Sequence, residues 1–149
     1  RNPCPKAVEK LASLLETDDN AYVRRATAWS LANYDNQIVL KPLINALKND
    51  VAAVRLWSSS SLAEIGNVSL KNAQLAAEQL LISLKIDNEP GVRSNCIWSL
   101  CRLYEKLNNT FQESFVDECT KIALFDKEPS VMEEAKTALD SMGMQGFYN

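Results

Sequence analysis

The side chains of this chain that could support chemistry are serines, carboxylates, cysteines and arginines, because histidine is absent. Without histidine, the usual general base and the commonest metal ligand are missing. The serine run at 58–61 therefore has no imidazole to activate it, and we expect it to pack between helices. Glu133 and Glu134 are adjacent in a predicted helix, where neighbouring side chains face different ways, so we expect solvated charges rather than an acid–base pair. We assign no catalytic residue.

The four cysteines stand at positions 4, 96, 101 and 119, without a CxxC pair. This spacing predicts no metal site and favours reduced thiols in a cytoplasmic protein, with Cys4 open to a redox or adduct role. No apolar run approaches the roughly 18 residues that a membrane span needs, so we expect no membrane partner.

Tryptophan and arginine are the residue types most suited to binding. Trp29, Trp57 and Trp98 could be exposed anchors for a partner, or could fill the contacts between packed helices. Arg25 and Arg102 could grip carboxylates through two parallel hydrogen bonds. Aromatic faces beside a guanidinium suit a protein partner, and equally a flat tetrapyrrole with its propionates.

An internal repeat must position these residues. Val23, Val54, Val92 and Val131 follow one another at spacings of 31, 38 and 39 residues, and a leucine stands eight places after each of them. Small residues stand four and seven places after each valine, and Asp or Asn stands five places before it. Offsets 0, 4, 7 and 8 lie on one side of a helix, so each valine is predicted to open a helix with one buried face. Repetition at this period is typical of a helical solenoid.

Each valine-led helix is preceded by another amphipathic segment, so the chain is predicted to be all-α. The first helices are expected at 5–16, 37–48, 70–85 and 110–125, and the second helices at 21–33, 52–65, 90–107 and 129–142. Gly66 and Gly143 follow two of the second helices, where a left-handed cap favours glycine. We predict one domain over 1–149, with repeats at about 5–36, 37–67, 68–108 and 109–143 and a tail at 144–149.

The stretches Tyr22-Val-Arg-Arg-Ala-Thr-Ala-Trp-Ser-Leu31 and Asp87-Asn-Glu-Pro-Gly-Val-Arg-Ser-Asn-Cys-Ile-Trp-Ser-Leu100 resemble the HEAT repeat. More narrowly, they resemble the HEAT-like repeats of the phycobilisome (bilin) lyase E/F family of cyanobacteria. The resemblance implies a right-handed α–α superhelix, armadillo-like in build, of about four helical hairpins. It also implies that the second helices line a concave binding surface.

The same resemblance implies a ladder of ion pairs between neighbouring turns. Its members would be Arg24, Arg55 and Arg93 with the acidic residues Asp18, Asp87 and Asp126. Over the predicted second helices the charge is +4 for the first three and −2 for the fourth, although the whole chain carries −3. This distribution predicts a positive strip on the second-helix surface. The acidic fourth repeat and the negative net charge argue against nucleic-acid binding.

The expected function is a non-catalytic scaffold or adaptor that binds a protein partner and needs no cofactor. The expected partner-binding residues on the concave face are Trp29, Trp57, Trp98, Arg25 and Arg102. The alternative is a bilin lyase, or a chaperone of phycobiliproteins, that transiently binds a bilin and contacts a phycobiliprotein subunit. The oligomeric state stays open.

Overall fold

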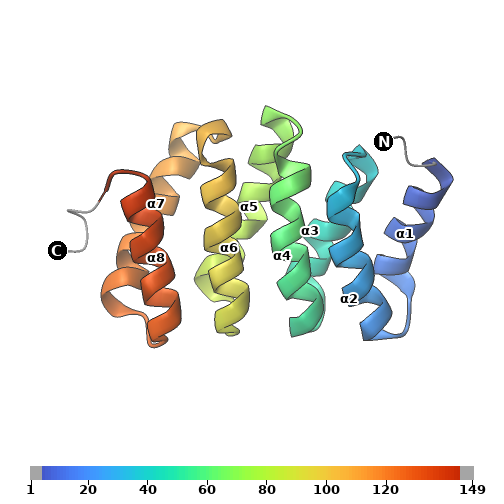
Figure 1. Ribbon diagram of the computed structural model, residues 1–149, viewed down its shortest axis with the longest axis horizontal. Helices are drawn as coiled ribbons and strands as arrows, with labels where there is room; N and C mark the ends of the chain where they lie inside the picture. Colours follow the sequence, from blue (N-terminus) through green and yellow to red (C-terminus); the bar gives the residue numbers. More distant parts are fainter. Residues whose placement is uncertain (1–4, 145–149) are drawn as a thin grey trace.

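The computed structural model describes residues 5–144 as a row of four helical hairpins (Figure 1). The first helices of the hairpins are α1 (Pro5–Thr17), α3 (Leu40–Asn49), α5 (Leu70–Ile86) and α7 (Asn109–Phe125). The second helices are α2 (Ala21–Ser30), α4 (Ala52–Gly66), α6 (Pro90–Leu103) and α8 (Pro129–Ser141). Short 3-10 turns cover Leu31–Asn33, Gln37–Val39 and Tyr104–Lys106. Residues 5–144 contain no strand, and the predicted all-α solenoid of helical hairpins is confirmed.

The helices form two layers. In Figure 1, α2, α4, α6 and α8 stand side by side in front, α3, α5 and α7 lie behind them, and α1 stands beside α2 at the end of the row opposite to α8. We call the outer surface of the front layer the second-helix face. The contacts between neighbouring second helices, α2–α4, α4–α6 and α6–α8, are called seams below. No helix in the described range is long and apolar enough to cross a membrane.

The core consists of the repeated apolar positions. The leucines eight places after each repeat valine are fully buried, namely Leu31, Leu62, Leu100 and Leu139. Val54, Val92 and Val131 are likewise 0–1% exposed. Val23 departs from the prediction, because it is 36% exposed. The reason is its place in the first hairpin, where no preceding second helix packs against it.

Small side chains let the second helices approach closely enough for hydrogen bonds across the seams. The hydroxyl of Ser61 donates to the carbonyl of Ala28, and the hydroxyl of Ser99 donates to the carbonyl of Ser59, both at 2.6 Å. Asn95 adds two contacts across the α4–α6 seam, to the carbonyl of Leu56 at 2.9 Å and to the hydroxyl of Ser60 at 2.8 Å. The small residues therefore hold the layer together through direct contacts to the backbone.

Gly66 has a different role from the predicted one. It is the last residue of α4 and has no positive φ, whereas Gly143 has φ 74° and makes the left-handed turn after α8. A Cβ atom at Gly66 would lie 3.1 Å from Leu103 and 3.2 Å from Ala76. Gly66 therefore permits close packing of the second and third hairpins at the end of α4, rather than making a left-handed cap.

Candidate functional site

An ion-pair ladder runs along the turns that join first to second helices. Arg24 pairs with Asp50 at 2.9 Å and Arg55 pairs with Asp87 at 2.8 Å, each through two guanidinium nitrogens. Arg93 reaches Asp126 through one nitrogen at 2.9 Å, and its buried Nε has no partner. Each pair joins a hairpin to the next one along the chain.

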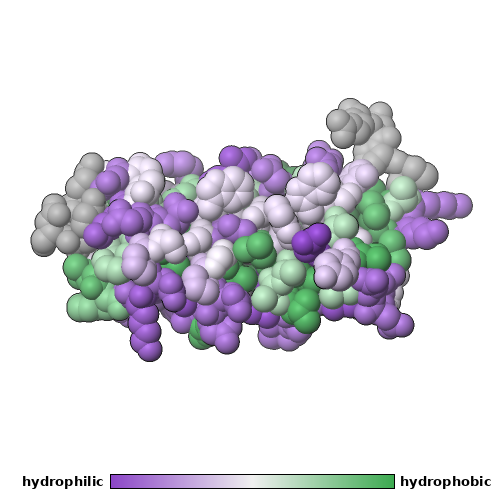
Figure 2. Space-filling model, turned by 60° about the horizontal axis from the view of Figure 1, so that its bottom comes forward, coloured by the Kyte–Doolittle hydropathy of each residue, from purple (hydrophilic) through white to green (hydrophobic). Residues whose placement is uncertain are grey.

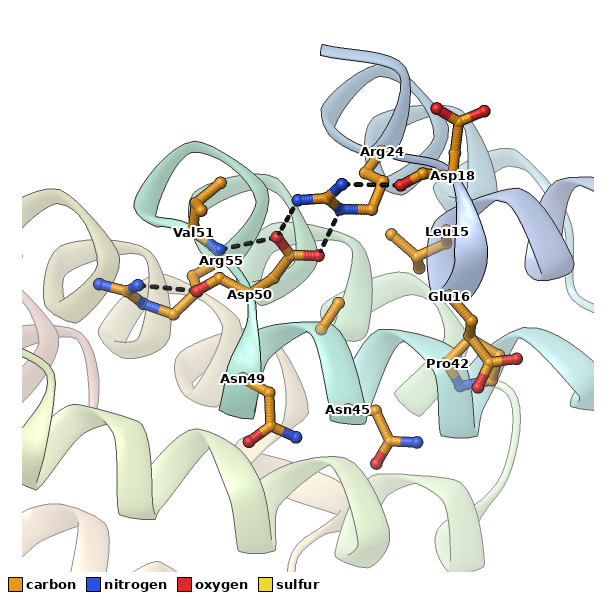
Figure 3. A pocket seen from close by; sticks show the side chains of 11 residues that line it. Leu15, Glu16, Asp18, Arg24, Pro42, Asn45, Asn49, Asp50, Val51 and Arg55 are labelled. Carbon is orange, nitrogen blue, oxygen red and sulfur yellow. Dashed lines mark hydrogen bonds and ion pairs between the residues drawn. The ribbon is translucent and has the colours of Figure 1, made fainter. Parts of the chain in front are cut away.

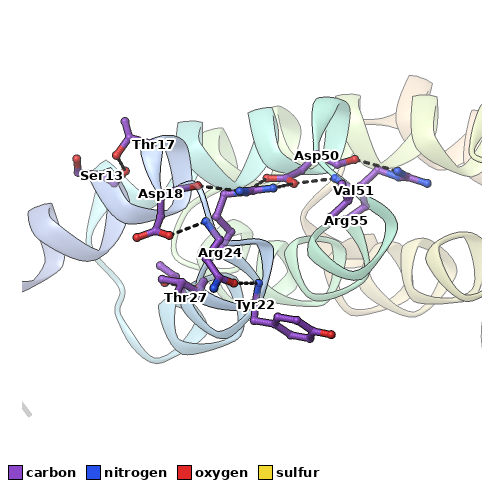
Figure 4. A network of polar contacts seen from close by, with 11 residues as sticks. Ser13, Thr17, Asp18, Tyr22, Arg24, Thr27, Asp50, Val51 and Arg55 are labelled. Atoms are coloured by element: carbon purple, nitrogen blue, oxygen red, sulfur yellow. Dashed lines mark hydrogen bonds and ion pairs between the residues drawn. The ribbon is translucent and has the colours of Figure 1, made fainter.

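Each ladder arginine also bonds its own turn. The Nη1 atom of Arg24 donates to the carbonyl of Asp18 at 2.7 Å, and Arg55 donates to the carbonyl of Asp50 at 2.9 Å (Figure 4). The hydrogen bonds that Arg24 donates to the Asp50 carboxylate raise the pKa of its guanidinium, although desolvation acts in the opposite direction. The ladder charges are thus held by one another, and these residues connect the repeats instead of presenting charge to a ligand.

The ladder differs in one detail from the sequence alignment. The aligned position of the second repeat is Asn49, but the carboxylate comes from the next residue, Asp50. Asp18 joins the ladder through its main-chain carbonyl, and its carboxylate makes no ion pair within residues 5–144. The turn of the first hairpin holds Asp18, but no hairpin before it supplies an arginine to pair with this carboxylate.

A pocket of about 840 Å³ lies between α1 and α3 beneath the first rung of the ladder (Figure 3). Arg24, Asp50 and Arg55 line it, but each of these charges is already engaged in the ladder. The other polar groups in its lining include Glu16, Asn45 and Asn49. The pocket lies where neighbouring repeats meet. Both of its arginines are already paired with aspartates, so no free cation lines it that could orient an anionic ligand.

A second cleft lies on the second-helix face, between α2 and α4. Arg25, Ala26, Trp29 and Trp57 line this tryptophan cleft, whose volume is about 420 Å³. Trp29 is 59% exposed, whereas Trp57 is half-buried and packs against the core. The Arg25 guanidinium lies 5.6 Å from the ring centre of Tyr22. Among the arginines in residues 5–144, Arg25 alone has no carboxylate partner.

Trp98 occupies the same repeat position as Trp29 but has different neighbours. Its ring is 43% exposed and lies 5.0 Å from the guanidinium carbon of Arg102, which stacks over it. Arg102 also pairs with Glu64 at 3.2 Å, and both side chains are close to half exposed. Arg102 therefore differs from Arg25, because α4 supplies a carboxylate beside it.

The comparison with known families decides what these hairpins are. The family described as HEAT repeats matches residues 8–101, which is more than half of the chain. The chain belongs to the HEAT-repeat family. No curated protein matches it. HEAT repeats commonly mediate protein–protein interaction.

Ion pairs offset most of the positive charge predicted for this HEAT surface. Four of the five arginines that contribute to the predicted charge are engaged by carboxylates, namely Arg24, Arg55, Arg93 and Arg102. Pairing across repeats could not be read from a charge count along single helices. What remains is a local cation, Arg25, beside two indole rings.

The cysteines of the HEAT hairpins are poor nucleophiles. Burial raises the pKa of the Cys101 thiol to about 11, and it also raises the pKa values of Cys96 and Cys119. All three are free thiols that stay protonated at neutral pH. Within residues 5–144 no group of three His, Cys, Asp or Glu side chains could hold a metal ion. Cys4 lies outside the described residues.

Sequence reasoning missed a set of exposed apolar residues at the edge where first helices end. Ile86 and Phe125 are 75% and 78% exposed, and each stands directly before a ladder aspartate. Aligning the residue before each aspartate would have found them. Figure 2, which brings this edge forward, shows separate green patches among purple side chains rather than one continuous apolar surface. These residues border the turns but do not line the tryptophan cleft.

Proposed function

We propose that the protein is a scaffold that binds a protein partner through the tryptophan cleft on its second-helix face. The observation that carries this proposal is the Arg25–Trp29–Trp57 arrangement, in which an arginine without a carboxylate stands beside an exposed indole and a half-buried one. Tryptophan and arginine are the side chains most enriched at the energetic centres of protein interfaces. Trp98 and Arg102 extend the same face toward the third hairpin.

The cleft favours a partner segment that combines a carboxylate with a large apolar side chain. The carboxylate would pair with Arg25, which donates from a planar fork, and the apolar side chain would lie between Trp29 and Trp57. Such a segment would give Arg25 the carboxylate partner that it lacks within residues 5–144, and it would cover Trp29, the more exposed of the two indoles.

A displayed library of random peptides tests the proposal. Peptides are selected on the wild-type protein and then depleted on Trp29→Ala, with Lys121→Ala as the matched control, because Lys121 is exposed on α7 in the other layer. The proposal predicts enriched peptides with Asp or Glu next to a large apolar residue, retained by the control and lost on Trp29→Ala. Peptides that bind Trp29→Ala equally well would contradict it.

The free thiols support a cytoplasmic setting for this interaction, which is part of the same proposal. The bilin alternative has a distinct readout in a cyanobacterial lysate. Two indoles beside one guanidinium could also hold a flat tetrapyrrole by one propionate. In this case a visible absorption band and a phycobiliprotein subunit would co-purify with the wild type, and both would be lost with Trp29→Ala. That result would favour a chromophore-handling function over the scaffold function.

A further inference from the structure

The α1–α2 end of the solenoid presents an open apolar surface. A shallow pocket of about 390 Å³ is lined by Leu11, Tyr22, Val23, Ala26, Thr27 and Ser30. Tyr22 is 75% exposed and Val23 is 36% exposed, although the equivalent valines of the later hairpins are buried. In Figure 2, green side chains gather at the end of the molecule that α1 and α2 form. This end is therefore a second-helix surface without the neighbour that every other second helix has on that side.

Ser30 shows what kind of neighbour fits. It stands seven places after Val23, the position from which Ser61 and Ser99 donate across the seams to backbone carbonyls of the preceding second helix. At the α1–α2 end the hydroxyl of Ser30 has no such carbonyl within residues 5–144. The Ser30 hydroxyl could therefore donate to a backbone carbonyl of a further helix, if that helix packed against α2 as α2 packs against α4.

Asp18 provides an independent indication at the same end. Its carboxylate accepts from the backbone N–H of Asn20 at 2.8 Å, as those of Asp87 and Asp126 accept from the residues two places on, at 3.0 and 2.9 Å. Asp87 and Asp126 then receive an arginine from the preceding hairpin, and Asp18 receives none. Figure 4 shows its carboxylate on the side of Arg24 opposite to Asp50, toward the open end.

The α7–α8 end carries neither feature. Met132 stands where the ladder arginine would be, so this end has no cation to offer a following aspartate. Lys136 stands five places after Val131, where the other three second helices have the buried residues Ala28, Ser59 and Ile97. Lys136 pairs with Glu133 at 3.5 Å. A charged outer surface of this kind is typical of a terminal repeat.

We propose that the α1–α2 end docks one further HEAT-type hairpin, whose second helix carries an arginine that pairs with Asp18. A second copy of this chain does not fit. Stacked end to end it would bring Met132 and Lys136 to the surface, and joined through two α1–α2 ends it would set the Asp18 carboxylates against each other. The docked hairpin would bury Val23 and accept a hydrogen bond from the Ser30 hydroxyl. It would add one more seam and one more ion pair of the ladder.

The test extends the full chain by a hairpin of its own type. Residues 70–108 are duplicated directly before Pro5, so that the added copy supplies α5, α6 and the ladder arginine of position 93 to the open end. In hydrogen exchange, the α2 amides should become about tenfold more protected than in the unextended chain. Changing the added arginine to Met should reduce this gain several-fold, and Asp18→Asn should do the same in the extended chain while leaving the unextended chain unchanged.

Three outcomes would overturn the proposal. The first is an added hairpin that unfolds separately and leaves α2 protection unchanged. The second is an Asp18→Asn effect that is equal with and without the added hairpin. The third is concentration-dependent self-association of the unextended chain, measured by sedimentation and abolished by Val23→Glu, which would assign the surface to a second copy. None of these readouts involves Trp29, so the result is independent of the proposed partner cleft.

Discussion

The seams and the second-helix face are made by the same four helices but follow different rules. At the seam positions, zero, four, seven and eight places after each valine, the four repeats carry valines, small residues and leucines that are buried in the interior hairpins. Six places after each valine, on the outer face, they carry Trp29, Ser60, Trp98 and Thr137. The seam positions, which are alike in all four repeats, hold the hairpins together. The position six places after each valine differs between repeats, so each hairpin presents a different side chain on the outer face.

The largest effect should come from the seams. Leu62 is fully buried between α4 and its neighbours, and Leu62→Ala should lower the free energy of unfolding by about 2–5 kcal/mol, because it leaves a cavity. Urea unfolding measures the change. A loss below about 1 kcal/mol, the range of surface substitutions, would show that the seam is not the stabilising element.

Replacing a ladder arginine and a surface arginine should have different effects on stability. Arg55 is held in the ladder by Asp87, whose side chain is 6% exposed, whereas Arg102 and Glu64 are 45% and 43% exposed. Arg55→Ala should cost about 1.5–3 kcal/mol, since charged hydrogen bonds are lost and a nearly buried carboxylate stays behind. Arg102→Ala should cost about 0.2–1 kcal/mol. Equal losses in urea unfolding would remove the distinction between ladder and face.

A smaller and opposite effect is expected at Ser58. Its buried hydroxyl has no hydrogen-bond partner, and the equivalent positions of later repeats hold Cys96 and Ala135. Ser58→Ala should raise the unfolding free energy by about 0.5–1 kcal/mol, because an unsatisfied polar group is removed. Ser61→Ala is the matched control, and it should lower stability by about as much, since its bond to Ala28 is lost. Destabilisation by both substitutions would mean that Ser58 is bonded after all.

The sequence predicted the helices and the buried positions well, because both follow from a periodicity that each repeat carries within itself. The errors lie where a neighbouring repeat decides the outcome. Val23 follows the repeat pattern but has no preceding helix to cover it, and Asp50 pairs with Arg24 although Asn49 holds the aligned position.

The candidate site shows the same limit. Trp29 and Trp98 share one repeat position, yet only the second is covered by an arginine that pairs with Glu64 on the adjacent helix. That contact joins residues 38 apart, so no pattern within a single helix could reveal it.

The dissociation constant of a selected peptide for Trp29→Ala tests the central claim most directly. The account predicts binding at least about tenfold weaker than for the wild type, because an exposed indole at the centre of the contact is lost. It also predicts an unfolding midpoint in urea close to that of the wild type, since Trp29 is 59% exposed. An unchanged dissociation constant, or a loss of binding that accompanies a large loss of stability, would contradict the assignment of this face to a partner.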